Sequence, residues 1–118
     1  MVTIDELREL VLSFPGTKEE PHFEKISFKV KKKIFATYEE KNRTTCIKLS
    51  EIDQDVFSLH DRTVIYPVPN KWGKQGWTFI EMKKVKKEIF IDALTTAYHE
   101  VAPENYLKQI TVKQEPGI

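Results

Sequence analysis

The sequence contains few cysteines and glycines and no long apolar run. Its 118 residues include one cysteine, Cys46, and four glycines. A single cysteine excludes an internal disulfide framework and fits a reducing compartment. No apolar run approaches the ~20 residues that span a bilayer, and the first residues lack the basic and apolar regions of a signal peptide. We therefore expect a cytoplasmic protein with no membrane partner, whose core needs neither disulfide nor metal.

Sequence patterns of catalytic chemistry are equally scarce. The three histidines, His22, His60 and His99, lie far apart in the chain and lack the spacing of metal ligands. No P-loop, Rossmann or G-x-S-x-G pattern occurs. Cys46 lies in the middle of an alternating segment, which favours a buried structural thiol over a nucleophile. The sequence therefore predicts no enzyme, no cofactor and no metal site.

What the chain does have is a concentration of rare residues in one segment. Both tryptophans and two of the four glycines fall within Trp72-Gly73-Lys74-Gln75-Gly76-Trp77. Trp77 opens a predicted strand, so we expect it in the core. Trp72 is either buried or free to stack on a base, with Lys74 reaching a phosphate. His22 either faces a ligand or ties its loop to a backbone carbonyl. His22, Trp72 and Trp77 are therefore the candidate pocket residues.

Charge is unevenly distributed along the chain, although the net charge is only +1. Residues 25–50 carry eight basic and two acidic side chains, and residues 71–87 carry six basic and one acidic. If these two blocks meet in space, they form one cationic face suited to a polyanion. If they do not meet, they are ordinary solvated lysines, which also protect sheet edges from aggregation.

Hydrophobic periodicity predicts three helices, over about residues 3–14, 50–59 and 85–101. The first begins with the capping box Thr3-Ile4-Asp5-Glu6, and Ser50 is the predicted cap of the second. Ile52, Val56 and Leu59 are the apolar residues of the second helix, and we expect them to face inward.

Period-two alternation predicts five strands, over residues 26–30, 34–38, 44–49, 63–66 and 77–82. Residues 17–25, which include Pro21, are expected to form a loop or a short edge strand. Lysines 31–33 form a tight turn or an edge. The order α-βββ-α-ββ-α predicts an α+β fold, a single two-layer domain with helices packed on one face of an antiparallel sheet. We place this domain at residues 1–110, with a short helical turn over 105–110 and a flexible tail over 111–118.

Five short motifs, in this order and spacing, resemble the MmcQ/YjbR family. They are Phe14-Pro15-Gly16, Glu20-Pro21-His22-Phe23, Phe28-Lys29-Val30 with Lys33-Ile34-Phe35-Ala36, Ile47-Lys48-Leu49, and the segment from Trp72 to Trp77. The resemblance covers about residues 3–101. It implies a small bacterial protein with a fold like that of type III secretion chaperones, also described as CyaY-like, and members are commonly labelled DNA-binding. The residues that match the family pattern are Pro15, Gly16, Pro21, His22, Phe23, Lys48, Trp72, Gly73, Gly76 and Trp77.

Two functions are therefore open. The first is electrostatic DNA binding of low sequence specificity, by Lys25, Lys29, Lys31, Lys33, Arg43, Lys48, Trp72 and Lys74. Lys29 and Lys31 alternate with Phe28 and Val30, so they project from the sheet face away from the helices or from its edge. The alternative is a protein-interaction or chaperone-like adaptor module, because an open sheet can accept a partner strand or helix. We expect a monomer, whereas a soluble dimer with a large exposed apolar face would favour the adaptor module.

Overall fold

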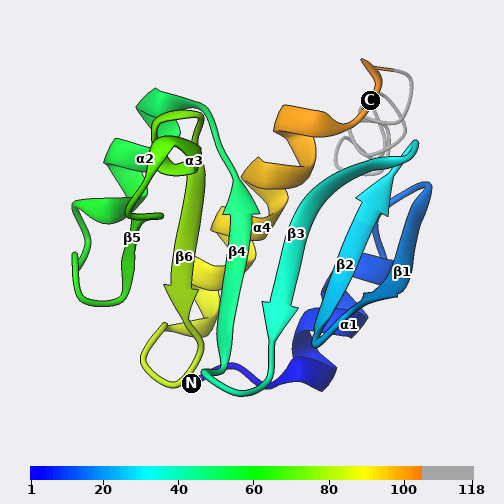
Figure 1. Ribbon diagram of the computed structural model, residues 1–118, viewed down its shortest axis with the longest axis horizontal. Coiled ribbons are helices and arrows are strands. Elements are labelled where there is room, and N and C mark those ends of the chain that lie inside the picture. The colour runs from blue at the N-terminus through cyan, green and yellow to red at the C-terminus, as the bar shows by residue number, and fades with distance from the viewer. Residues whose placement is uncertain (105–118) are drawn as a thin grey trace, which may run out of the picture.

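Six strands and four helices make up residues 1–104, the part of the chain that the computed structural model describes (Figure 1). In chain order they are α1 (Ile4–Leu12), β1 (Thr17–His22), β2 (Lys25–Val30), β3 (Lys33–Glu39), β4 (Thr44–Lys48), α2 (Glu51–Ser58), β5 (Ile65–Pro67), α3 (Lys71–Lys74), β6 (Trp77–Glu81) and α4 (Lys87–Val101). The predicted turn over 105–110 and the tail over 111–118 lie outside the described residues. None of the helices in residues 1–104 has the length and apolar character that crossing a membrane requires.

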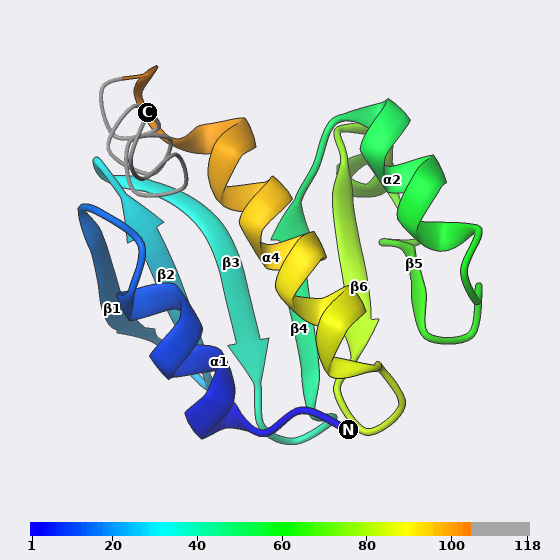
Figure 2. The same cartoon turned by 180° about the vertical axis from the view of Figure 1, so that it is seen from behind.

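The strands form one antiparallel sheet in the order β1-β2-β3-β4-β6-β5. Helices α1, α4 and α2 lie across the same face of this sheet (Figure 2). Residues 1–104 leave the opposite face, toward the viewer in Figure 1, largely open. The predicted α+β fold with helices on one face is therefore confirmed.

The core lies between the sheet and the helices because alternate strand residues point to that side. Phe28 and Val30 of β2, with Ile47 of β4, are completely buried there against α1 and α4. Each fully buried side chain of this size stabilises the fold by about 1.5–3 kcal/mol. Tyr98 of α4 stacks on Phe14 and donates a 2.6 Å hydrogen bond to the carbonyl of residue 15, which fixes α4 against the end of α1.

The helix starts follow the predicted caps. Thr3 Oγ1 accepts a hydrogen bond from the Glu6 backbone N–H, and the Glu6 carboxylate accepts one from the Thr3 N–H, which completes the capping box. Ser50 Oγ accepts a 3.1 Å hydrogen bond from the Asp53 N–H at the start of α2. These bonds satisfy backbone donors that a helix N-terminus otherwise leaves without partners.

Two elements go beyond the predicted order. Residues 17–22 form a true edge strand, β1, which pairs with β2 along its length. Pro21 is tolerated there because an edge strand has one side without ladder hydrogen bonds. The tryptophan segment contains the short helix α3, whose four residues are too few to show a helical period.

The orientation of α2 differs from the prediction. Ile52, Val56 and Leu59 were expected to face inward, but they are 76%, 51% and 69% exposed. The buried side of the helix carries Gln54 and Ser58 instead. The physical reason is that the Gln54 amide supplies hydrogen bonds to α3 and β6, donating to the carbonyls of Gly73 and Trp77 and to Thr78 Oγ1.

The β2–β3 hairpin curves the sheet. Lys31 and Lys32 both have positive φ, +50° and +69°, in the two-residue turn that the lysine run predicted. Phe28 pairs with Ala36 and Lys29 pairs with Ile34, so Phe35 is an extra residue in β3. Such a bulge bends its strand and increases the local twist. The bend in β3 is visible in Figure 1.

Candidate binding site

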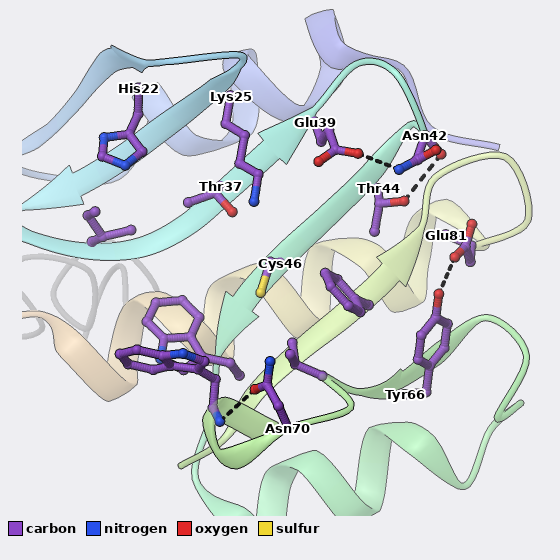
Figure 3. A pocket seen from close by; sticks show the side chains of 15 residues that line it. His22, Lys25, Thr37, Glu39, Asn42, Thr44, Cys46, Tyr66, Asn70 and Glu81 are labelled. Atoms are coloured by element: carbon purple, nitrogen blue, oxygen red, sulfur yellow. Dashed lines mark hydrogen bonds between the residues drawn. The ribbon is translucent and has the colours of Figure 1, made fainter. Parts of the chain in front are cut away.

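The open face of the sheet is hollowed by a pocket of about 980 Å³. Its lining comes from β1, β2, β3, β4, β5 and β6, together with the loop before α3 and α3 itself (Figure 3). The lining residues are His22, Lys25, Ile34, Thr37, Glu39, Asn42, Thr44, Cys46, Tyr66, Val68, Asn70, Trp72, Trp77, Phe79 and Glu81.

Cross-strand register arranges the floor of this pocket in rows. One row, which crosses the sheet from β1 to β6, is His22, Lys25, Glu39, Thr44 and Glu81. The next row is Thr37, Cys46, Phe79 and Tyr66. Directly opposed residues have Cβ atoms about 4.5–5.5 Å apart, so each row is a continuous surface. The pocket therefore has a charged row beside a more apolar row.

The charged row contains two carboxylates with hydrogen-bond partners. Tyr66 Oη donates to Glu81, and Asn42 Nδ2 donates to Glu39. Burial, followed by the hydrogen bond to Glu81, raises the pKa of Tyr66 to about 12, so the phenol is a neutral donor at physiological pH. With two carboxylates and one lysine, Lys25, this row is not a cationic surface.

Cys46 lies in the middle of the floor and is half-buried instead of sealed in the core as expected. The reason is its register, because it pairs with Phe79 on the open side of the sheet. Burial raises the pKa of the Cys46 thiol to about 11. A thiol with that pKa is protonated at neutral pH and is a poor nucleophile. No group of three His, Cys, Asp or Glu side chains in residues 1–104 could hold a metal ion.

Backbone contacts explain the glycines of the tryptophan segment. A Cβ on Gly73 would lie 1.9 Å from the carbonyl oxygen of Val68, and one on Gly76 would lie 1.7 Å from that of Leu49. Gly76 also has a φ of +104°, which L side chains rarely adopt. These glycines therefore press the segment against the ends of β4 and β5, and this contact sets the position of α3.

The two tryptophans occupy one end of the pocket. Asn70 caps α3 by accepting a 2.8 Å hydrogen bond from the Trp72 N–H, and the Trp72 side chain remains 50% exposed. Trp77 was expected in the core, but it is half-buried on the open face. Alternation is the reason, because the next residue, Thr78, takes the buried position and donates to the carbonyl of Gly76.

All three candidate pocket residues, His22, Trp72 and Trp77, line this hollow. Tyr66 and Phe79, which the sequence did not single out, line it as well, with ring centroids 5.7 Å apart in an edge-to-face pair. Alternation along β6 was the available signal, since it places residues 77, 79 and 81 on one face. Tyr66 had no such signal, because β5 has only three residues.

The segments that carry the two basic blocks are neighbours, because β4 pairs with β6, but Lys48 is the one basic residue among the paired positions. Of the predicted DNA-binding residues, Lys25 and Trp72 line the pocket. Lys74 belongs to α3, the helix that carries Trp72. Lys71, which the prediction omitted, has its Nζ 5.9 Å from the centroid of the Trp72 ring.

The other predicted cations do not line the pocket, although Lys48 lies directly opposite Trp77 in the pairing of β4 with β6. Lys29 forms a 2.8 Å ion pair with Glu20, and Lys48 Nζ donates a 3.1 Å hydrogen bond to the Leu49 carbonyl. Lys31 and Lys33 lie at the β2–β3 turn, and Arg43 lies in the β3–β4 turn, which is at the other end of β3. The predicted cations are therefore spread over both ends of the sheet.

Comparison with known proteins identifies relatives of this fold. Residues 12–100 match the family model YjbR. The crystal structure of Deinococcus radiodurans protein DR2400, which carries the DUF419 domain, superposes with a TM-score of 0.73 at 21% identity, covering 83% of this chain and 77% of that chain. At this identity the likeness shows the fold alone. Among curated proteins, none matches this sequence significantly.

Proposed function

This chain belongs to the YjbR family, and we propose that it binds DNA non-enzymatically and with low sequence specificity on the open face of its sheet. The observation that carries the proposal is the half-exposed indole of Trp72 at one end of an aromatic-lined pocket, on a short helix that also carries Lys71 and Lys74. Aromatic rings beside basic side chains are the combination by which proteins bind nucleic acids without reading sequence.

The pocket favours a single strand over a duplex. Tyr66, Trp72, Trp77 and Phe79 line one continuous hollow. The bases of a duplex are stacked on one another, so their faces can reach these rings only when the strand is single. Each base stacked on an aromatic side chain contributes about 1–3 kcal/mol. The edge-to-face pair of Tyr66 and Phe79 already holds two of the rings in place.

The phosphates would follow the basic side chains at the pocket margin. Lys25 lies on one side of the pocket, and Lys71 and Lys74 lie on α3. The carboxylates of Glu39 and Glu81 would repel phosphates from the charged row of the pocket floor, to which both residues belong. Three contacts predict a plot of log affinity against log salt with a slope of about −2, because each phosphate contact on a single strand adds about −0.7. We therefore expect weak, salt-sensitive binding.

The test is a fluorescence anisotropy titration with a labelled oligothymidylate of about 12 nucleotides, at about 50 and 200 mM salt. Trp72→Ala should weaken binding about 5- to 150-fold, the equivalent of one stacked base. Trp72→Phe should retain most of the affinity. Leu59→Ala, at the exposed apolar residue that ends α2, is the matched control and should change nothing. No binding at the lower salt, or equal binding by Trp72→Ala, would refute the proposal.

A protein-interaction or chaperone-like adaptor module is the second candidate function. It is favoured by the apolar residues that α2 exposes in the helical layer, away from the open face of the sheet (Figure 2). Because the two surfaces lie on opposite layers, one molecule can use both.

A further inference from the structure

The helix α2 presents a continuous apolar surface to solvent. Ile52, Val56 and Leu59, here called the α2 stripe, are all exposed. Residues spaced by three and four lie one above another on a helix, so the stripe is a single ridge about 10 Å long. In residues 1–104 no other helix exposes three large aliphatic side chains in this spacing.

The rest of the fold holds the stripe in its exposed position. Gln54, on the opposite side of α2, is buried and donates to the carbonyls of Gly73 and Trp77 and to Thr78 Oγ1. Turning α2 to bury the stripe would pull this amide away from its acceptors and place it in solvent. The hydrogen bonds of Gln54 therefore keep the α2 stripe exposed while α2 stays packed against the rest of the fold.

The stripe is bordered by acidic side chains. On a helix with 3.6 residues per turn, Glu51 and Asp55 flank it on one side and Asp53 on the other. No basic residue occurs between residues 51 and 59. None of the three carboxylates forms an ion pair within the described part of the chain. The surface is therefore an apolar ridge between two unneutralised acidic borders.

We propose that the α2 stripe binds a basic amphipathic helix of a partner protein. The apolar side of such a helix would cover the ridge, and its lysines or arginines would meet the acidic borders. This charge complementarity selects the occupant, because nucleic acids and anionic membranes are repelled by the same borders.

A second copy of this chain fits the stripe poorly. In a two-fold interface α2 would meet α2, and the acidic borders would face one another. A basic helix instead brings the opposite charge to these borders.

The probe is a synthetic helical peptide of about 16 residues, with leucines at the spacing i, i+3, i+4, i+7 and lysines at all other positions. Its binding to the isotope-labelled chain is followed by amide shifts in NMR spectra. Shifts should cluster over residues 51–61 and saturate. The same peptide with glutamates in place of lysines should bind at least about tenfold more weakly, since like charges then meet.

Variants locate the binding on α2. Val56→Asp should weaken binding at least about tenfold, because it breaks the ridge and adds to the acidic repulsion. Leu12→Asp is the matched control, since Leu12 of α1 is about as exposed as Val56, and it should bind like the parent chain. Ile52→Asp repeats the test at a more exposed position in case Val56→Asp affects folding, which a thermal melt of each variant checks.

Three results would overturn the inference. They are equal binding by the glutamate peptide, binding that Val56→Asp and Ile52→Asp leave unchanged, and shifts that fall on the open sheet face. A concentration-dependent dimer in sedimentation that Val56→Asp dissociates would identify a second copy as the occupant. The titration is repeated on Trp72→Ala, which should leave peptide binding unchanged, so failure of DNA binding and failure of this inference remain distinguishable.

Discussion

Replacing Gln54 with leucine should destabilise the protein by about 2 kcal/mol. The Gln54 Nε2 lies 3.0 Å from the Gly73 carbonyl, 3.1 Å from the Trp77 carbonyl and 3.0 Å from Thr78 Oγ1. The amide has two N–H groups, so it makes the equivalent of two full hydrogen bonds. Each contributes about 0.5–1.5 kcal/mol net. Leucine has a similar volume, so no cavity penalty is added.

The acceptors that lose Gln54 keep other partners, which limits the loss. The Trp77 carbonyl also accepts from the Val68 N–H at 3.0 Å, and the Gly73 carbonyl accepts from the Gly76 N–H at 3.0 Å. The two carbonyls therefore keep a donor, and Thr78 Oγ1 keeps the hydrogen bond that it donates to the Gly76 carbonyl. This avoids the cost of about 1–3 kcal/mol for a buried polar group left without any partner. The expected loss of stability therefore stays at about 2 kcal/mol, the middle of the range for two hydrogen bonds.

The measurement is urea unfolding followed by tryptophan fluorescence, with the slope of the transition unchanged and its midpoint lowered. A fall of roughly 8 °C in the melting temperature should accompany it. Asp55→Leu, at the exposed neighbouring position, should remain within about 0.5 kcal/mol of the parent chain. If Gln54→Leu is as stable as the parent, the amide does not set the orientation of α2, and the argument for a fixed α2 stripe fails.

Three further perturbations test the loop and the pocket floor. Gly76→Ala should destabilise the fold by at least ~3 kcal/mol, because the added methyl group would clash with the Leu49 carbonyl at a residue whose φ is positive. A soluble variant that unfolds in urea at the same midpoint as the parent chain would contradict this. Labelling of Cys46 by a thiol reagent at pH 8 should be on the order of a hundred times slower than that of free cysteine, because its pKa is about 11. The pKa of Tyr66 rises on folding from the usual ~10 to about 12, so its contribution to stability is complete below pH ~10 and is lost as the pH rises toward 12. In urea unfolding, the Tyr66→Phe variant should therefore lose less stability than the parent chain over that pH range. Part of the pH dependence should remain, because the pKa of Tyr38 also rises to about 12. If the variant loses as much stability as the parent, Tyr66 does not contribute to the pH dependence.

The sheet was predictable because its signal is local. In residues 26–30 each apolar side chain alternates with a polar one, which predicts a half-buried strand. In residues 77–82 the same period predicts a strand, but polarity does not assign its faces, since Thr78 is buried while Trp77 and Phe79 line the open side. The orientation of α2 was not predictable in the same way. Its apolar period is real, but the side that packs is decided by Gln54, whose acceptors lie 19 to 24 residues further along the chain.

The candidate site was partly visible in the sequence. Trp72 and Trp77 stood out because tryptophan is rare, and both line the pocket. Glu39 and Glu81 were missed because they approach each other through the register of β3, β4 and β6, and one sequence does not state that register. The ion pair of Lys29 with Glu20 was missed because the sequence left β1 undecided between a loop and a strand.

Because the sheet is covered on one side only, neighbouring residues of one strand have different roles: one packs in the core and the next lines the pocket. In β6, Thr78 and Ile80 are sealed against the helices, while Trp77, Phe79 and Glu81 face the hollow. A saturation mutagenesis library sorted for cellular abundance should deplete substitutions at the even positions and tolerate them at the odd ones. The same library sorted for ligand capture should add losses at the odd positions, so consecutive codons of one strand would report separately on folding and on recognition.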